Sequence, residues 1–348
     1  MTPRERMHRV LGKGQPDRVP VRYWAGLPEA VKAELIGSCA DEKERMKKQQ
    51  EMVNALPSIM SGVLRPVIED DGNNYVQRCE TGVIIRGRHK PAPFREFSNF
   101  PIKTAKDLDN FQMPEVNNPA RYEGFRERVE RYHQADCFIA AYCVGPFQGP
   151  TLFLREFTEF LMDFVQDLGF AKAIMEMYTE FILEDIRTRL ELGADAVEMG
   201  DDLGSNDALF IHPQTFRELV KPLYARLIAA WKAIRPDVKV MLHCDGNIND
   251  IFEDLIEVGL DAVNRLDPAD NMDITELKRN YGTQIALMGG FSRHLGQMGR
   301  KELRKHITEV MEAGKPGGAY IAEVGIHPEM ALDDVRYVVE IVESLRDY

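Results

Sequence analysis

Short apolar runs alternate with longer amphipathic segments along most of this chain, and the alternation is clearest from residue 137 onward. Each apolar run has the length of a strand buried on both faces, and each longer segment has the spacing of a helix with one apolar side. We predict strands over 137–144, 194–202, 238–246, 261–268, 284–292 and 319–326. Helices are expected over about 151–164, 168–192, 213–234, 251–259, 274–282, 300–314 and 331–346.

The N-terminal part carries further elements of the same kinds. Residues 2–12 predict a short helix, because Thr2 is a good N-cap and Glu5 occupies the capping-box position. Residues 18–26 alternate apolar and polar side chains, as a strand does, and residues 41–54 are charged and helical. The stretch from about 62 to 115 has turn signals and short β-like runs, which predict an inserted β-hairpin region covering one end of the fold.

Regular alternation of strands and helices is typical of a parallel α/β fold. The number of units favours a TIM-type (β/α)8 barrel over residues 1–348, with an N-terminal helical extension and the insertion at about 62–115. An open doubly wound sheet is the alternative, but no GxGxxG loop follows a predicted strand.

The composition narrows the function classes. A net charge of −12 argues against a nucleic-acid-binding protein, which would need a basic face. No apolar run approaches the roughly 18 residues that span a bilayer, and the N-terminus lacks the apolar core of a signal peptide. The five cysteines are odd in number and unpatterned, which indicates free thiols. We therefore expect a soluble, cytoplasmic protein without a membrane partner.

Polar and acidic side chains gather where the predicted strands end. In a barrel these ends converge on one mouth, where functional groups sit. Crowded carboxylates there must be protonated, paired with arginine or bound to a cation. The candidates in chain order are Tyr142, Glu198, Asp201, Asp202, His243, Cys244, Asp245, Asn264 and Glu323.

His243 is the central candidate for a metal ligand. Strand alternation places His243 and Asp245 on the same side of their strand and Cys244 on the other. Glu323, from a different strand, would complete a set with an imidazole and carboxylates, which suits zinc with one open position. The alternative is a structural histidine beside a small buried thiol.

Aromatic residues near the strand ends are candidates for a pocket wall. Phe147 lies in the GPFQGP turn that follows the strand 137–144. Trp24 ends the first predicted strand, and its position fits either a pocket or plain core packing.

Several segments together resemble the uroporphyrinogen decarboxylase superfamily over nearly the full length of the chain. They are MTPRERMHRVLGKGQPDRVPV, LGADAVEMGDDLGSNDALFIHPQTFRELVKP, KVMLHCDGNINDIFEDLIEVGLDAVNRLDP, IALMGGFS and GGAYIAEVGIHPEMALDDV. The resemblance implies a TIM-type barrel with its active site in the mouth described above.

Two branches of that superfamily imply different chemistry. The decarboxylases carry an arginine-rich segment for the substrate carboxylates, whereas here Arg22 stands without its paired arginines. The zinc-dependent methyltransferases hold their metal through H-x-C and a later cysteine. Here that motif reads His243-Cys244-Asp245, and residues 323–326 hold no cysteine. The resemblance therefore favours the O-demethylase-like relatives, which pass a methyl group from a small donor, such as a methoxylated compound, to a corrinoid protein.

This branch implies roles for the candidates. Zn²⁺ would be held by His243 and Glu323, with Asp245 or Cys244, and a corrinoid (cobalamin) would be carried by the partner protein. The donor pocket would be formed by Trp24, Tyr142, Phe147 and Asn264, and the catalytic residues would be Glu198, Asp201 and Asp202. Glu198 or Asp202 would protonate the leaving group or orient a ligand.

Two alternatives belong to other function classes. One is a metal-independent decarboxylase or lyase that acts on a smaller substrate, with Asp201 or Asp202 as general acid. The other is a non-catalytic barrel that binds a corrinoid or tetrapyrrole. The superfamily resemblance also admits a homodimer.

Overall fold

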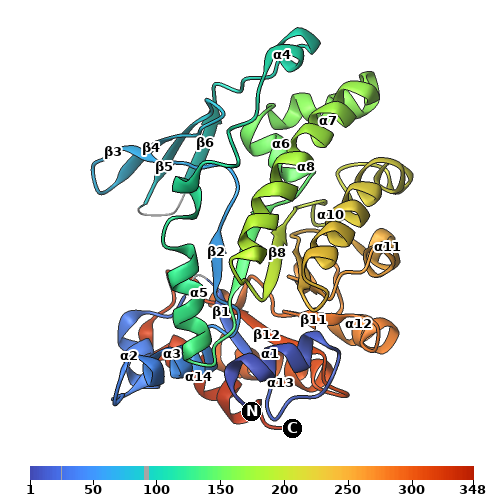
Figure 1. The fold of residues 1–348 in the computed structure, drawn as a ribbon. Coiled ribbons are helices and arrows are strands. Elements are labelled where there is room, and N and C mark those ends of the chain that lie inside the picture. The colour runs from blue at the N-terminus through green and yellow to red at the C-terminus, as the bar shows by residue number, and fades with distance from the viewer. Residues whose placement is uncertain (25, 90–93) are drawn as a thin grey trace.

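The computed structural model describes residues 1–24, 26–89 and 94–348, and it has the architecture of an α/β barrel (Figure 1). Eight parallel strands form one sheet in the order β1-β12-β11-β10-β9-β8-β7-β2. Backbone bonds from Tyr23 N to Val53 O (3.0 Å) and from Ala55 N to Val21 O (2.7 Å) join β1 to the segment leading into β2. The two ends of the sheet therefore meet, and the predicted TIM-type fold is confirmed.

The strands of the barrel agree with the predicted ones in place, although most are shorter. Each is extended only where its backbone pairs with both neighbours, so the polar ends of the predicted strands lie in the loops that follow. The strands are β1 (Val21–Trp24), β2 (Ser58–Met60), β7 (Ala140–Val144), β8 (Ala196–Gly200), β9 (Lys239–His243), β10 (Ala262–Asn264), β11 (Ala286–Met288) and β12 (Tyr320–Gly325). Ala25, at the end of the predicted strand 18–26, lies outside the described residues.

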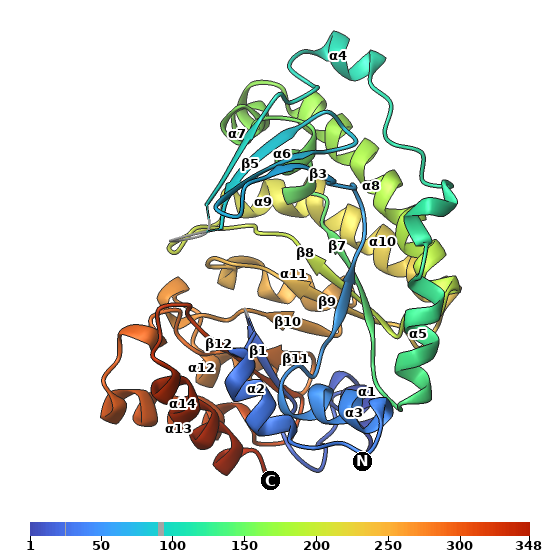
Figure 2. The ribbon, with the colours of Figure 1, turned by 90° about the vertical axis from the view of Figure 1, so that its left-hand side faces the viewer.

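Helices cover the outside of the barrel (Figures 1 and 2). They are α1 (Pro3–Leu11), α2 (Glu29–Ile36), α3 (Glu42–Met52), α4 (Ala105–Asn110), α5 (Phe125–Gln134), α6 (Gln148–Phe153), α7 (Phe157–Gln166), α8 (Leu168–Glu191), α9 (Pro213–Thr215), α10 (Lys221–Ile234), α11 (Phe252–Glu257), α12 (Ile274–Tyr281), α13 (Arg300–Gly314) and α14 (Leu332–Leu345). The predicted helix 151–164 is wrong in one respect, because it is two helices. The chain turns at the buried Arg155, whose guanidinium binds Asp163 and the backbone oxygen of Lys103 (3.0 Å).

Helix α1 closes one end of the barrel. It begins with the predicted capping box, in which Thr2 and Glu5 each accept a bond from the other's backbone N–H. Its buried residues Met7, Val10 and Leu11 belong to the same apolar cluster as side chains from the strands. The N-terminal helix is therefore part of the barrel core and fills one end of it.

Period-two alternation divides the strand side chains between two apolar layers. The inner cluster takes residues from several strands, and they are Ala140, Ala196, Met241, Ala262, Ala286, Met288 and Ile321. The larger outer cluster, between strands and helices, takes the neighbours of these residues, including Ala141, Val197, Leu242, Val263, Leu287 and Ala322. Counting onward from these residues indicates whether a polar side chain at a strand end faces the barrel axis or the helices.

The predicted insertion is a four-stranded antiparallel sheet. Its strands are β3 (Val67–Asp70), β4 (Asn74–Arg78), β5 (Ile84–Arg88) and β6 (Phe94–Ser98), in that order. It lies at the end of the barrel opposite to the two chain termini (Figures 1 and 2). Residues 90–93, which fall within the predicted insertion, lie outside the described part of the chain.

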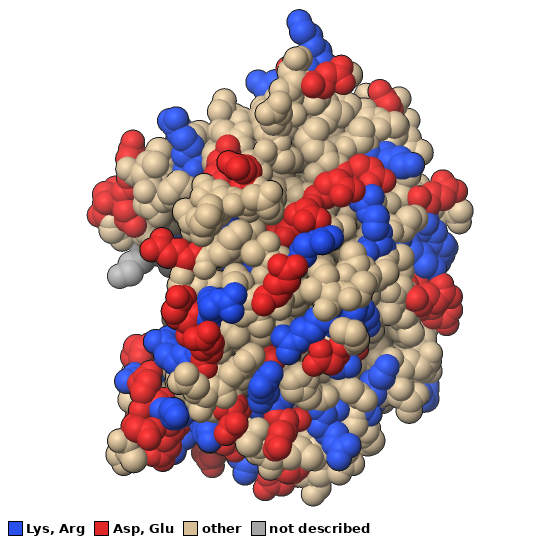
Figure 3. Space-filling model, in the orientation of Figure 1, with Lys and Arg blue, Asp and Glu red and all other residues tan. Residues whose placement is uncertain are grey.

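The structure also bears on the surface charge, on membrane-spanning helices and on the cysteines. Acidic and basic side chains are interspersed over the face shown in Figure 3. Within the described residues, no helix combines the length and apolar character that crossing a membrane requires. The cysteines are free thiols, and four of them are buried.

Asp195 ties three elements together at the start of β8. Its fully buried carboxylate accepts bonds from Arg4 (2.6 Å), His133 (3.1 Å) and the backbone N–H of Ile139 (3.0 Å). These groups belong to α1, α5 and the segment before β7. Because one carboxylate satisfies donors from separate elements, its loss affects several packing contacts at once.

We predict that Asp195→Ala lowers the free energy of unfolding by about 3 kcal/mol, since it leaves buried donors without an acceptor. Asp237→Ala is the control, because Asp237 is an exposed partner of Arg235 and should matter by less than about 1 kcal/mol. Urea denaturation of both variants measures the difference, and equal effects would contradict this role for Asp195.

Candidate functional site

Two carboxylates and one imidazole lie close together where β8 and β9 end. Ligand atoms of Asp202, His243 and Asp245 all lie within 4.8 Å of one another, and we call these residues the acidic–histidine group. The side chains of Met241, His243 and Asp245 follow the inward parity of β9, and Asp202 follows that of Glu198 on β8. Two of the residues predicted as ligands, His243 and Asp245, are thus brought together, and Asp202 joins them.

The loops after β8 and β9 pack closely, which holds the two aspartates near each other. The Asp245 backbone N–H donates to Asp202 (2.9 Å), and Gln148 donates to the other oxygen of Asp202. Gly246 has φ +97°, and a Cβ there would lie 2.2 Å from the backbone oxygen of Gly204. Only glycine fits this turn without displacing the neighbouring loop.

Burial and neighbouring charges set the electrostatics of the group. Burial raises the pKa of Asp202, and the Asp245 backbone N–H and His243 oppose the rise. Arg265 places a guanidinium nitrogen 3.7 Å from the Asp245 carboxylate, which is 44% exposed. Two carboxylates and one imidazole in this small space form a donor set that attracts a divalent cation.

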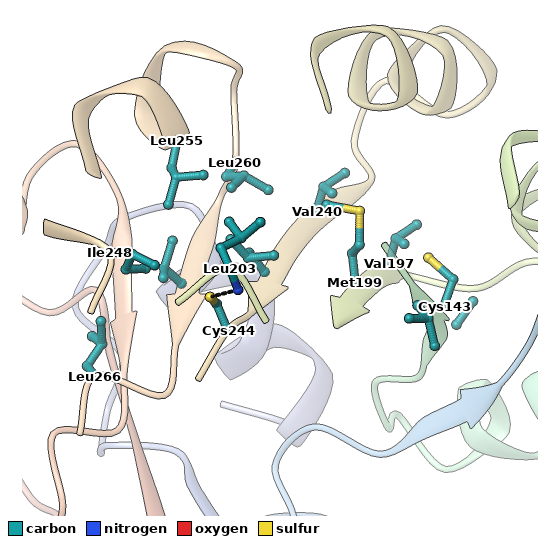
Figure 4. Close-up of a cluster of buried hydrophobic side chains, with 14 of the residues drawn as sticks. Cys143, Val197, Met199, Leu203, Val240, Cys244, Ile248, Leu255, Leu260 and Leu266 are labelled. Atoms are coloured by element: carbon teal, nitrogen blue, oxygen red, sulfur yellow. Dashed lines mark hydrogen bonds between the residues drawn. The ribbon is translucent and has the colours of Figure 1, made fainter. Parts of the chain in front are cut away.

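Cys244 does not join the group. Its thiol lies on the helix-facing side of the strand among buried apolar residues such as Ile248, Leu255 and Leu266 (Figure 4). The sulfur accepts a bond from the Leu203 backbone N–H at 3.3 Å, and burial raises the pKa of the thiol well above its usual range. The structure thus places Cys244 in the hydrophobic layer, as alternation requires, and away from the group for which it was a candidate ligand.

Glu323 and Glu198 also lie apart from the acidic–histidine group. Both are buried in the barrel around Arg22, which donates to Glu198 at 2.5 Å and lies 3.4 Å from Glu323. Burial opposes the charge of Arg22, but the two carboxylates outweigh it and raise its pKa. Glu323 was predicted as a metal ligand, yet the structure pairs it with Arg22 and Asn264 instead.

Asp201 faces away from the mouth, because it has the opposite parity to Asp202. Its fully buried carboxylate accepts bonds from the backbone N–H groups of Phe147 (3.1 Å) and Gln148 (2.5 Å) and from the Tyr224 hydroxyl (2.7 Å). Burial raises its pKa to about 7. Asp201 therefore anchors the start of α6 to α10, in place of the catalytic position that we predicted from its neighbourhood.

Four residues predicted to bind substrate have different surroundings. Trp24 stacks on His243, with ring centres 5.3 Å apart. Asn264 hydrogen-bonds His243 Nδ1 at 2.9 Å. Tyr142 pairs in register with Glu198, and burial raises the pKa of its hydroxyl. Phe147 alone of the four lines the cavity described next.

A cavity of about 450 Å³ adjoins the acidic–histidine group. Asp202 and Asp245 form part of its wall, and half of the remaining lining residues are aromatic. The aromatic residues are Phe97, Phe100, Phe147, Phe157 and Phe210, and the polar ones include Gln148, Thr151 and Glu156. The size and lining suit a small, largely apolar molecule that presents a heteroatom toward the aspartates.

The sequence interpretation missed most of this wall. Phe97 and Phe100 come from the inserted sheet and its following loop, and Phe157 begins α7. Their signal was the aromatic-rich run FREFSNF in the predicted insertion, but nothing in its spacing indicates which aromatic side chains reach the mouth. The insertion therefore contributes to the pocket as well as covering the barrel.

Comparison with known proteins agrees with this architecture. The sequence model of the uroporphyrinogen decarboxylase (URO-D) family matches residues 92–345. The chain belongs to this family. Uroporphyrinogen decarboxylase from Hydrogenobaculum sp. (strain Y04AAS1) is 22% identical over 214 residues, which are 60% of this chain and 59% of the relative. An enzyme of that name from Thermus thermophilus is 25% identical over 175 residues, which are 49% and 48% of the two chains. The chain thus spans about half to three fifths of these relatives.

The fold is similar to the solved structure of a methyltransferase from Methanosarcina mazei. It superposes with a TM-score of 0.66 at 18% sequence identity and covers 99% of both chains. The likeness shows that the two proteins share a fold over almost the whole length of both chains.

The opposite parity of Asp201 and Asp202 gives a direct test. Asp201→Ala should lower the free energy of unfolding by about 3 kcal/mol or more, because it leaves three buried donors unpaired. Asp202→Ala, at a partly exposed position, should cost no more than about 1 kcal/mol. Urea denaturation of the two neighbours compares them, and a more destabilising Asp202→Ala would refute this division.

Proposed function

We propose that this URO-D family member is a metal-dependent methyltransferase, which moves a methyl group from a small donor to a corrinoid carried by a partner protein. The observation that supports this most directly is the acidic–histidine group in the wall of the aromatic cavity. The fold that the chain shares with a methyltransferase is compatible with the proposal.

The residues present fit a zinc ion. Asp202, His243 and Asp245 offer one nitrogen and two carboxylate ligands from two adjacent strand ends, and these residues would hold the ion with one of four ligand positions left for the donor. Asn264 accepts from His243 Nδ1, the kind of outer contact that orients a ligating imidazole. When bound, zinc would supply Lewis acidity toward a heteroatom of the donor.

The cavity residues would hold the donor and exclude water. Phe147, Phe157 and Phe210 give an apolar surface for the body of the donor, and Phe97 and Phe100 close it from the side of the insertion. Gln148 donates to Asp202 and so fixes one carboxylate at the boundary between the cavity and the acidic–histidine group. A small methoxylated compound, oriented with its oxygen toward the aspartates, fits this arrangement.

The same site is poorly suited to a substrate with many carboxylates. Arg22 is buried and already paired with Glu198 and Glu323, so it offers no free guanidinium. Among the described residues that line the cavity, acidic side chains occur but no lysine or arginine. A metal-independent decarboxylase would also need a general acid in the cavity, and Asp201, one of the two candidates, faces the helices.

We predict that the purified protein binds about one Zn²⁺ per chain, measured by elemental analysis and chelator competition. His243→Ala should weaken zinc binding at least about 100-fold, because it removes the sole nitrogen ligand of the proposed site. Cys244→Ala is the matched control at the next position, and it should retain zinc because the thiol faces the helix layer. Loss of zinc in Cys244→Ala, with retention in His243→Ala, would overturn the ligand assignment.

Methyl transfer is tested with free Co(I) cobalamin as acceptor and a panel of methoxylated aromatic compounds as donors. We expect the absorbance of methylcobalamin to appear with at least one donor, and Asp202→Asn to slow its appearance about 100-fold or more. Release of CO2 from uroporphyrinogen, without methyl transfer, would instead establish the decarboxylase alternative. Cobalamin binding without turnover of any donor would favour a non-catalytic barrel.

A further inference from the structure

A chain of buried polar side chains leads from His243 to β10 and β12. His243 Nδ1 lies 2.9 Å from the Asn264 side-chain oxygen, and the Asn264 amide nitrogen donates to Glu323 at 2.8 Å. The other Glu323 oxygen lies 3.4 Å from Arg22, which also binds Glu198. Each of these residues is more than nine-tenths buried.

The direction of these bonds follows from the groups available. A carboxylate only accepts hydrogen bonds, so Glu323 requires the amide N–H of Asn264 to face it. The carbonyl oxygen of Asn264 is then turned to His243, and this oxygen also only accepts. Nδ1 of His243 must therefore carry a proton, and in the neutral ring the lone pair is then on Nε2.

The ring of His243 is also fixed in orientation. Trp24 lies parallel to it, with an angle of 13° between the rings, and the Arg22 guanidinium lies 4.8 Å from the Trp24 ring centre. Arg22 and Trp24 are alternate residues of β1, so both side chains point into the barrel. One strand thus supports the imidazole face and the carboxylate that orients Asn264.

We propose that Asn264 and Glu323 are positioning residues that hold His243 in the Nδ1–H tautomer, with Nε2 available to a metal. Arg22 keeps Glu323 in place as an acceptor. This assignment replaces the roles that the sequence suggested, in which Glu323 was a metal ligand and Asn264 bound substrate. The expected effect of these residues on metal affinity rests on the proposed function. The tautomer of His243 does not depend on that function.

The ion pair with Arg22 favours an accepting Glu323, whereas burial opposes its charge. Burial raises the pKa of Glu323, and the charges of Arg22, His243 and Arg265 oppose the rise, while Glu198 adds to it. One guanidinium faces two carboxylates, so the bond to Asn264 gives Glu323 a second partner that Glu198 lacks. The Glu323 oxygen that binds Asn264 is consequently committed within the barrel.

The test uses ¹⁵N-histidine NMR of the metal-free protein, with the His243 signals identified by their absence in His243→Gln. Spectra recorded over a pH series identify the range in which the ring is neutral, and in that range wild type should show Nδ1 protonated and Nε2 unprotonated. Asn264→Leu removes the acceptor and should abolish this preference. Asn280→Leu, the same change at an exposed position of α12, is the control.

Glu323→Gln gives a second, conservative variant. A glutamine can donate as well as accept, so it no longer forces the orientation of Asn264, and we expect a mixture of His243 tautomers. Zinc affinity, measured by chelator competition, should fall about 10- to 100-fold in Asn264→Leu.

The outcomes separate this inference from the proposed function. An Nε2–H tautomer in wild type, or an unchanged tautomer in Asn264→Leu, would overturn the positioning role whatever the metal content. The expected tautomers in a protein that binds no zinc would uphold the positioning role and refute the proposed function. Zinc binding that is equally tight in wild type and Asn264→Leu would overturn the link between tautomer and metal.

Discussion

The two-residue alternation of parallel strands in a closed barrel determines what each polar side chain of this protein can do. Residues of even number on β8, β10 and β1 point to the axis, as do residues of odd number on β9 and β12, and their neighbours point to the helices. Asp202 and Asp201 are adjacent, yet one meets His243 and the other meets Tyr224. A shift of one residue in register would exchange these environments.

The same constraint divides the interior into levels. Apolar side chains such as alanine and methionine fill the end closed by α1. The next level holds Arg22 with its two carboxylate partners, Glu198 and Glu323. The acidic–histidine group follows and borders the cavity. This order keeps apolar atoms at the closed end of the barrel, and among the charged groups of these levels only the two aspartates line the cavity. In such a barrel the strand ends and loops can carry different chemistry without a change in the closed end.

Local pattern was sufficient to predict the barrel, the capping box at Thr2 and the pairing of His243 with Asp245, since all three depend on short-range periodicity. It was insufficient for Glu323, whose partners come from β1 and β10, far apart in the sequence. It also missed Phe97 and Phe100, because contact between the insertion and the mouth depends on how the antiparallel sheet packs. The break of the predicted helix 151–164 has the same origin, in the tertiary bonds of Arg155.

The buried ions beneath His243 are difficult to explain by stability. Removing two carboxylates and a guanidinium from water costs several kcal/mol for each ion, and apolar side chains of similar volume often serve stability equally well. The neighbouring level of the barrel already uses such apolar side chains. What apolar residues cannot do is fix the direction of the Asn264 amide, which needs an obligate acceptor at 2.8 Å. The ion cluster is therefore best explained by the orientation it imposes on the imidazole. Its desolvation cost is then a cost of organising the site, and the cluster need not stabilise the fold.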